Sequence, residues 1–486
     1  MVTENRPPVI CPPVILRPPR TVPCHSNHPL LPLLISPGNR PLVTKKRRLH
    51  GKMNCYELNA LTEKEYSELL RRAEVDITKH YPLAEEVIDR VRQEGDKALR
   101  DYTLKFDGVS LKGKSLRITE EEISGAFKEL DAPTRDALQY AADNIEKYHR
   151  EQLPPEMWMK EIDNGLVAGE KVTPISDVCL YVPRGKGSFP SVMLMLGIPA
   201  VIAGVPRIVV CTPPGAAGKL ETATLAAAHI AGITEIYRIG GMQAIAAVAF
   251  GTESIPRCRK VIGPGNAFVN AAKRLLYGVL DVGLPAGPSE AIILADESAD
   301  PHLVALDLMI EAEHGPDSAA LLVTHSRELT EKVRQVLPEL LQKLPEERRR
   351  FVETVFNNYG GIVLTEKLDE SIRFVNDFAP EHLEILTTEP FSVLPRIQNA
   401  GEILLGTSAP ITLGNFLLGT NAILPTGSFA KTFSGVSVRD FLKRSSFGYV
   451  TPEGFAKVKE AAVQIAEAEG FWAHALAVKE RKLPEA

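Results

Sequence analysis

Two glutamates and a histidine stand close together near the end of an apolar run, in "MIEAEHGPDS" at 309–318. If this run is a helix that ends before Gly315, Glu311 and His314 share one face and Glu313 points elsewhere. A carboxylate and an imidazole at this spacing suit two ligands of one metal ion. Two ligands do not hold a zinc, however, and carboxylates near helix ends are common. The metal interpretation therefore needs further ligands from elsewhere in the chain.

Two glycine turns could hold a nucleotide, "YRIGGMQAIAAVA" at 237–249 and "VIGPGNAFVNAAKR" at 261–274. Each turn follows a strand-like run and opens a helix, so it presents backbone N–H groups to a bound phosphate. Neither turn matches G-x-G-x-x-G, and no acidic residue lies at the usual ribose spacing. Simple connections have the same appearance. The amides of Gln243 and Asn266, just inside the two helix starts, favour the nucleotide interpretation.

The elements that must position these residues follow an α/β pattern from about residue 53 onward. Runs such as "RIVVCTPP" and "KVIGPGN" alternate with helical patterns such as "ATLAAAHIAG" and "AFVNAAKRLLYG". Short strands separated by helices indicate βαβ units and parallel sheets. We expect two doubly wound layers, one near 179–290 and one assembled from segments on either side. The tail from about 437 is predicted to be helical.

The first 52 residues differ from the rest of the chain. They hold eleven of the 37 prolines and a "KKRR" cluster at 45–48. Proline at this density opposes helices and sheets, so we expect a disordered leader. An acid-poor leader with arginines could be an organelle transit peptide, but serine is scarce and the prolines disfavour an amphipathic helix. A dispensable leader on a cytoplasmic protein is the alternative.

Composition excludes several classes of protein. The chain has 486 residues, a net charge of −5 and 44% apolar residues, which is ordinary for a globular protein and gives no sign of nucleic-acid binding. No run of eighteen residues is free of charges and turn-formers, so no membrane span is expected. The six cysteines form no C-x-x-C pair, and Cys179 and Cys211 lie in apolar runs. Buried free thiols are the expected state.

Several blocks of sequence together resemble the histidinol dehydrogenase family. They run in the family's order from about 53 to 478, and they are "CLYVPRGKGSFPS", "IGGMQAIAAVAFGTE", "GPGNAFVNAAKR", "AGPSEAIILAD", "EAEHG", "FAPEHLEI", "LGTNAILPTG" and "EGFWAH". The P-E-H-L and G-P-G-N-x-F-V blocks are highly specific in this combination.

The resemblance implies a zinc-containing, NAD-dependent homodimer that oxidises an amino alcohol through an aldehyde to a carboxylate. It implies two incomplete Rossmann-like parallel-sheet domains with small helical dimerisation parts. We expect a first domain from 53–178 and 291–436, and a second, NAD-binding domain from 179–290. Residues 437–486 would be a helical part that contributes to the dimer and the metal site.

The resemblance also implies roles for residues that match the family's motifs. Tyr181, Gln243 and Asn266 would contact NAD, and Ser289 and Glu469 would bind the substrate. Glu381 and His382 of "PEHL" would be the acid/base pair. Removing hydride from an alcohol requires a base for the hydroxyl proton, and histidine titrates near neutral pH. Without the family blocks, a helix-start carboxylate with a packed histidine after Pro380 is the favoured interpretation of this pair.

Four zinc ligands are implied as well, and two of them differ from the family's pattern. The family has Gln, His, Asp and His where this chain has Glu311, His314, Asn415 and His474. Both sets contain one carboxylate, so a bound Zn²⁺ would keep the same net charge. All four side chains have oxygen or nitrogen donors of the right kind. We therefore expect a retained zinc.

Ala422 stands where the family has a histidine that faces the substrate. A methyl group cannot form a hydrogen bond, so we expect a different alcohol from histidinol. One alternative is a true histidinol dehydrogenase of histidine biosynthesis. The other is an inactive paralogue that acts as a binding partner, against which the retained Glu381 and His382 speak. A small-molecule alcohol and a second copy of the chain are the expected partners.

Overall fold

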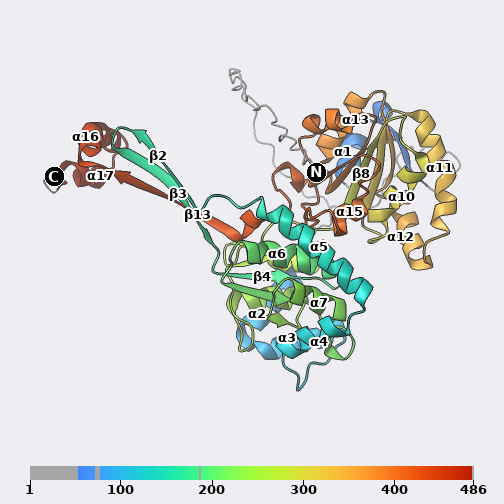
Figure 1. The fold of residues 1–486 in the computed structure, drawn as a ribbon, viewed down its shortest axis with the longest axis horizontal. Coiled ribbons are helices and arrows are strands. Elements are labelled where there is room, and N and C mark those ends of the chain that lie inside the picture. Colours follow the sequence, from blue (N-terminus) through green and yellow to red (C-terminus); the bar gives the residue numbers. More distant parts are fainter. Residues whose placement is uncertain (1–52, 72–76, 185–187, 484–486) are drawn as a thin grey trace, which may run out of the picture. The chain divides into compact units, whose positions relative to one another are not determined.

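The computed structural model describes residues 53–71, 77–184 and 188–483 (Figure 1). All of these belong to one unit of the chain, Lys45–Ala486. The proline-rich segment 1–52 lies outside the described residues, so its disorder and any targeting role stay predictions.

A six-stranded parallel sheet holds the first group of elements, in the order β1-β10-β9-β8-β11-β12. Its strands are β1 (Cys55–Glu57), β8 (Glu290–Ala295), β9 (Ala319–Thr324), β10 (Gly361–Leu364), β11 (His382–Leu386) and β12 (Glu402–Leu405). Alternate residues of a strand face opposite sides of a sheet. Ile293 accordingly packs in one apolar cluster and Ile292 in another. Such continuous apolar strands are typical of a parallel sheet covered on both faces.

Helices cover both faces of this sheet. The cluster around Ile293 takes side chains from α10 (Pro301–Ala312), α11 (Arg327–Leu341) and α12 (Glu346–Asn357). The cluster around Ile292 takes them from α1 (Glu63–Arg71) and α13 (Leu368–Phe378). Two short helices, α14 (Pro390–Val393) and α15 (Ile411–Phe416), flank β12 in the chain.

A four-stranded parallel sheet has the order β6-β5-β4-β7. Its strands are β4 (Asp177–Tyr181), β5 (Arg207–Cys211), β6 (Ile236–Tyr237) and β7 (Lys260–Ile262). Its helices are α6 (Pro190–Ile202), α7 (Thr222–Ile230), α8 (Gly241–Phe250) and α9 (Ala267–Leu275). Two α/β units with parallel sheets are thus present, as the strand and helix pattern predicted.

The helices between residues 81 and 150 differ from the expected division. They are α2 (Tyr81–Glu94), α3 (Asp96–Asp107), α4 (Glu120–Glu129) and α5 (Ala132–Arg150). These helices pack on α6 to α9, and Val87 and Ile145 lie in the two clusters of the four-stranded sheet. They therefore belong with that sheet and not with the rest of 53–178. Helical periodicity reveals an apolar face, but not which element covers it.

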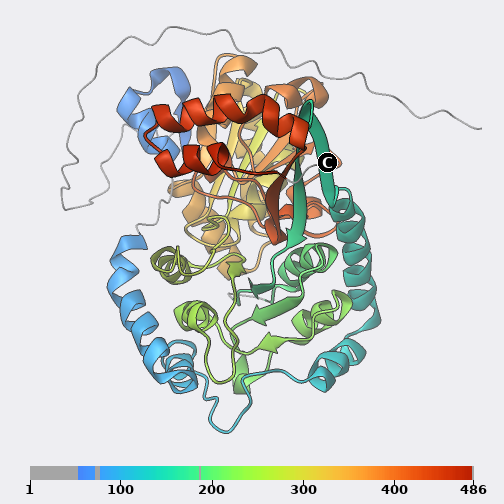
Figure 2. The same cartoon turned by 90° about the vertical axis from the view of Figure 1, so that its left-hand side faces the viewer.

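A three-stranded antiparallel sheet carries the last two helices (Figures 1 and 2). Its order is β13-β3-β2, with β2 (Met157–Asp163), β3 (Leu166–Pro174) and β13 (Leu442–Val450). Strand β13 leads into α16 (Pro452–Ala468) and α17 (Trp472–Lys479). Near the start of α16, the Thr451 N–H donates to the Gly165 carbonyl in the β2–β3 turn. We call β2, β3, β13, α16 and α17 the arm.

The arm corrects the expectation of a wholly helical tail, since 442–450 is a strand. This strand pairs along its whole length with β3, which lies far away in the chain. A pairing between such distant segments leaves no local signal in the sequence. None of the described helices is long and apolar enough to cross a membrane. Cys179, Cys211 and Cys258 are buried free thiols, as expected for the first two.

Candidate active site

Glu311 and His314, the two candidate metal ligands of "EAEH", lie at the C-terminal end of α10. Asp300 caps the N-terminus of this helix by accepting from the His302 N–H, and Pro301 occupies its first position. The helix ends at Ala312, and the turn after it brings His314 to Glu311, whose carbonyl accepts from the His314 N–H at 3.3 Å. Glu311 Oε2 lies 3.1 Å from His314 Nδ1, and the Glu311 side chain is only 2% exposed. The two side chains lie together as predicted, although His314 follows the end of the helix.

Two further side chains contact the same carboxylate. Asn415, on α15, donates from Nδ2 to Glu311 Oε1 at 2.9 Å. The Ser289 hydroxyl, just before β8, also hydrogen-bonds Glu311. Three of the four expected metal ligands and one expected substrate-binding residue therefore meet around a single buried carboxylate.

The charge of Glu311 is held by its neighbours. Burial raises the pKa of this carboxyl, but His314, His382 and the hydrogen bonds from Asn415 and Ser289 lower it, and the net pKa lies below its ordinary value. Glu311 is therefore a carboxylate at neutral pH. A metal ligand must be deprotonated, so this environment suits the role.

The donor set fits a zinc ion but is incomplete in one chain. Glu311, His314 and Asn415 supply carboxylate, imidazole and amide donors, one fewer than the usual four ligands. Within the described residues no three His, Cys, Asp or Glu side chains form a metal-binding group. His474 lies on α17 with its ring 5.2 Å from that of Phe471. No hydrogen bond or ion pair of the described chain joins it to the other three.

Like His474, Glu469 is not joined to the Glu311 cluster within the described chain. It is the exposed C-terminal cap residue of α16, on the arm. Within one described chain it makes no ion pair with the Glu311 cluster, so neither arm residue is brought to the other predicted site residues.

Glu381 and His382 lie beside the Glu311 cluster. His382 begins β11, and its Nε2 is 4.0 Å from Glu311 Oε1. Glu381 Oε2 accepts from the Glu290 N–H at 2.9 Å, which fixes the carboxyl at the amino-terminal ends of β8 and β11. Since a strand follows Pro380, the alternative of a helix-start carboxylate is wrong.

Burial and charge shift both groups of this pair. Burial lowers the pKa of His382, but the hydrogen bond with Glu402 and the charges of Glu311 and Glu381 raise it, to about 9. Burial raises the pKa of Glu381 well above its ordinary value, His382 lowers it, and Glu311 raises it further. Strongly shifted acids and bases in one place are a mark of a functional site.

One member of the site was missed in the sequence. Glu402, at the start of β12, is buried, and its Oε2 lies 3.0 Å from His382 Nδ1. Its other oxygen accepts from the Thr420 hydroxyl at 2.5 Å. The only local signal is an acid at the entry of the apolar run "GEILLG", which does not reveal its partner.

The predicted NAD-contacting residues gather at the carboxyl ends of β4, β6 and β7, where α/β proteins bind nucleotides. The Tyr181 hydroxyl accepts from the Gly241 N–H at 3.0 Å. Asn266 caps α9 by accepting from the Val269 N–H at 3.1 Å. Gln243 is 1% exposed, and within the described structure neither Oε1 nor Nε2 has a hydrogen-bond partner. An unpaired buried amide is costly unless a ligand satisfies it, so these residues fit a dinucleotide.

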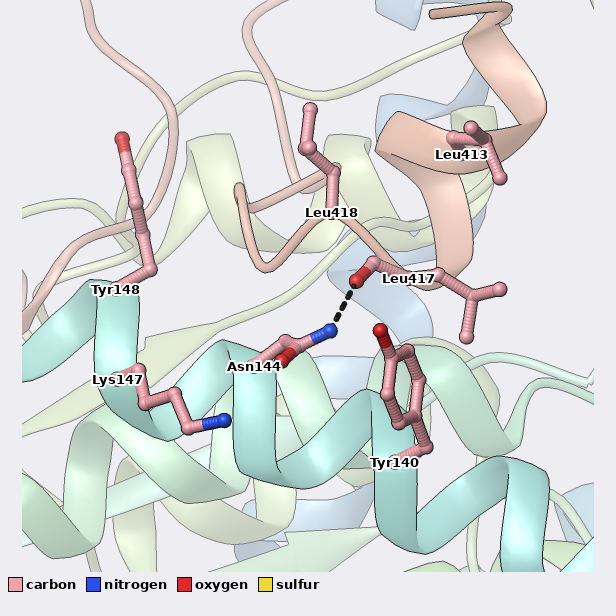
Figure 3. A pocket seen from close by; sticks show the side chains of 7 residues that line it. All are labelled: Tyr140, Asn144, Lys147, Tyr148, Leu413, Leu417 and Leu418. Carbon is pink, nitrogen blue, oxygen red and sulfur yellow. Dashed lines mark hydrogen bonds between the residues drawn. The ribbon is translucent and has the colours of Figure 1, made fainter. Parts of the chain in front are cut away.

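Ala422 lies on the edge of an apolar cluster that also contacts Leu417. Its backbone N–H points to Met195 Sδ at 3.4 Å. The neighbouring segment 413–418 contains Asn415 and borders a cavity of about 480 Å³ (Figure 3). That cavity is lined by Tyr140, Asn144, Lys147, Tyr148, Leu413, Leu417 and Leu418. Asn144 Nδ2 donates to the Leu417 carbonyl at 2.9 Å and so attaches this segment to α5.

Comparison with known proteins identifies the family. The family model for histidinol dehydrogenase matches residues 70–482. A histidinol dehydrogenase of Synechocystis sp. is 52% identical over 88% of this chain and 98% of its own length. A histidinol dehydrogenase homolog of Rhizobium meliloti is 48% identical over 90% and 97%. The crystal structure of histidinol dehydrogenase from Elizabethkingia anophelis matches with a TM-score of 0.83 and 34% identity, over 89% of this chain and 98% of the other. The chain therefore belongs to the histidinol dehydrogenase family.

Proposed function

We propose that the protein is a zinc- and NAD-dependent dehydrogenase that oxidises a polar primary alcohol, through the aldehyde, to a carboxylate. One observation carries this proposal: the buried Glu381–His382 pair lies directly beside the Glu311, His314 and Asn415 cluster. An acid/base pair next to metal donors matches what alcohol oxidation requires.

Each residue of the site has its own role in the proposed reaction. Zinc, held by Glu311, His314 and Asn415, would act as a Lewis acid towards the alcohol, and two NAD molecules in turn would each accept one hydride, the first from the alcohol and the second from the hydrated aldehyde. His382 takes the hydroxyl proton, and Glu381 holds the water that adds to the aldehyde. Gln243, Tyr181 and Asn266 orient the dinucleotide, and Ser289 contacts the substrate.

The active form is a homodimer in this proposal. Each site would take the partner subunit's His474 as its fourth metal ligand and the partner subunit's Glu469 as a contact to the substrate. The exposure of both residues on the arm supports this arrangement. Large apolar side chains also face solvent on the arm, and they include Met159, Ile162, Tyr449, Ile465, Phe471, Trp472 and Leu476. Such a surface favours contact with another protein chain.

The proposed substrate is smaller or less basic than histidinol. Ala422 and Leu417 present apolar surface where the family has an imidazole. A second candidate, L-histidinol itself, is favoured by the name of the Synechocystis relative. An inactive paralogue is disfavoured, because Glu381, His382 and the unpaired Gln243 amide would have no use in it.

Two measurements test the proposal. NADH formation over a panel of amino alcohols and diols, with L-histidinol included, identifies the substrate. Activity with a smaller alcohol and little with L-histidinol is the expected result. Elemental analysis should find about one zinc per subunit. Protein without NADH formation on any alcohol, and without stoichiometric metal after zinc is added back, would contradict the proposed function.

A further inference from the structure

We infer that Glu402 is the positioning residue of His382: it holds the proton on Nδ1 and leaves Nε2 as the atom that exchanges protons with the substrate. The inference rests on the proposed function for its kinetic consequence only. The hydrogen bond and the protonated ring nitrogen can be tested without any substrate.

The sheet itself aligns the two residues. Strands β11 and β12 are parallel neighbours, and His382 is the register partner of Glu402. Both side chains are nearly excluded from solvent, with 3% and 5% of the side-chain surface exposed. Their contact of 3.0 Å has the ordinary length of an N–H···O hydrogen bond and orients the imidazole ring towards the Glu402 carboxyl.

Both oxygens of Glu402 are engaged. While Oε2 meets His382 Nδ1, Oε1 accepts from the Thr420 hydroxyl at 2.5 Å. Two bonds on different oxygens prevent the carboxylate from rotating. The ring of His382 is therefore restrained by a group that is itself restrained, as in the acid–histidine pairs of hydrolases.

The backbone at residue 414 leaves room for the Glu402 carboxyl group only because this residue is a glycine. A Cβ at Gly414 would come within 2.6 Å of Glu402 Oε2 and 2.8 Å of Oε1. Gly414 directly precedes Asn415, which contacts Glu311. The carboxylate that orients His382 thus also packs against the turn of α15 that presents a candidate metal ligand.

The chemical consequence concerns the tautomer of the ring. A carboxylate can only accept, so Nδ1 must carry the hydrogen of this bond. In the neutral ring the lone pair is then on Nε2, the nitrogen that faces Glu311 Oε1 at 4.0 Å. Without Glu402 the ring could take either tautomer, and the one with Nε2 protonated cannot accept a proton at Nε2.

The test compares Glu402→Gln with a matched control, Glu384→Gln. Glu384 is a buried glutamate on β11, two residues after His382, but it makes no hydrogen bond with His382 among those of the described chain. An amide at 402 can face His382 with either its oxygen or its nitrogen, so the tautomer is no longer fixed. We expect kcat to fall by about 10²–10⁴ with KM changed by less than about threefold. The control should retain its kcat.

A spectroscopic measurement separates positioning from a structural role. In protein labelled with ¹⁵N-histidine at alkaline pH, where the ring is neutral, the His382 signal is assigned by its absence from His382→Asn. Wild type and Glu384→Gln should show the Nδ1–H tautomer, and Glu402→Gln a mixture or the Nε2–H tautomer. Thr420→Val should shift the same signal less, because one bond to Glu402 remains.

Each outcome decides the inference. An Nε2–H tautomer of His382 in the wild-type protein would overturn it whether or not Glu402→Gln folds. Unchanged kcat in Glu402→Gln would overturn it as well. If no alcohol is oxidised by the wild-type protein, the proposed function fails, while the tautomer measurement still decides the role of Glu402.

Discussion

At the scale of single residues, the adjacent side chains of Glu381 and His382 lie in different environments. Glu381 is fixed by the Glu290 N–H and His382 by Glu402, so the two side chains of one dipeptide are held by different partners. Under the proposed function, these separate environments suit separate roles in the two oxidation steps.

Substituting each member of the pair tests this division. His382→Asn should impair the alcohol oxidation, whereas Glu381→Gln should mainly impair conversion of the aldehyde to the acid. Loss of one general base lowers the rate by about 10²–10⁴. Supplying alcohol or aldehyde in separate assays distinguishes the two steps. Near-normal turnover of both variants on both substrates would show that these roles are wrong.

The substrate prediction also belongs to single residues. Restoring Ala422→His together with Glu311→Gln and Asn415→Asp should raise kcat/KM for L-histidinol, since a site that hydrogen-bonds a polar group prefers substrates that carry it by about 10⁴ or more. Ala422→Leu serves as the control, because it changes size without adding a hydrogen-bonding group. Efficient histidinol oxidation by the wild-type chain would show that Ala422 has little influence on specificity.

At the scale of elements, the start of α8 is prepared for a ligand. Gln243 lies within the first turn, buried and without a hydrogen-bond partner in the described structure. The Gln243 amide therefore contributes little to the stability of the free protein. We expect it to form hydrogen bonds when NAD binds.

Gln243→Met tests this preparation. The KM for NAD should rise by about 10- to 100-fold, because the cofactor loses a partner in a buried site. The thermal midpoint of the free protein should stay the same or increase, since an unsatisfied amide is replaced by an apolar side chain of similar length. A fall in that midpoint with an unchanged KM would mean that Gln243 has a structural role instead.

Strand β11 carries a second buried acid whose behaviour depends on pH. Burial, followed by the charge of the Asp307 carboxyl on α10 and a hydrogen bond with it, raises the pKa of Glu384 to about 9. Burial also raises the pKa of Asp307 to about 6. At these two sites the folded protein binds protons more tightly than the unfolded chain, so their contribution to the free energy of unfolding decreases as the pH rises from about 5 to about 9.

Glu384→Gln should remove the part of this pH dependence that comes from Glu384. The amide resembles the protonated acid, so the variant and wild type should have similar thermal midpoints near pH 5. The variant should then become the more stable of the two as the pH approaches 9. Parallel midpoint curves for the two proteins across this range would contradict the assignment.

At the scale of the whole molecule, one chain holds only part of the proposed site. Glu311, His314 and Asn415 lie together, whereas His474 and Glu469 are on the exposed face of the arm. If the arm of each subunit completes the partner's site, defects in the two parts should complement each other.

Mixed dimers test this sharing. His382→Asn and His474→Ala should each have little activity alone. When they are co-refolded or co-expressed, random pairing makes half of the dimers mixed, and each mixed dimer has one intact site, so about a quarter of the wild-type activity should return. Activity that stays at the level of the separate variants would mean that His474 serves its own subunit or none.

The sequence by itself determined the alternation of strands and helices, the family, and the candidate residues in each motif. These depend on local features: the apolar runs of β8 and β9, the Asp300 cap of α10, and blocks such as "PEHL". Tertiary structure alone decided what lies between distant segments. It brought Glu402 to His382, placed residues 81–150 on the four-stranded sheet, and paired β13 with β3. Contacts of this kind depend on which surfaces meet after the chain has closed long loops, and no short stretch of residues encodes that choice.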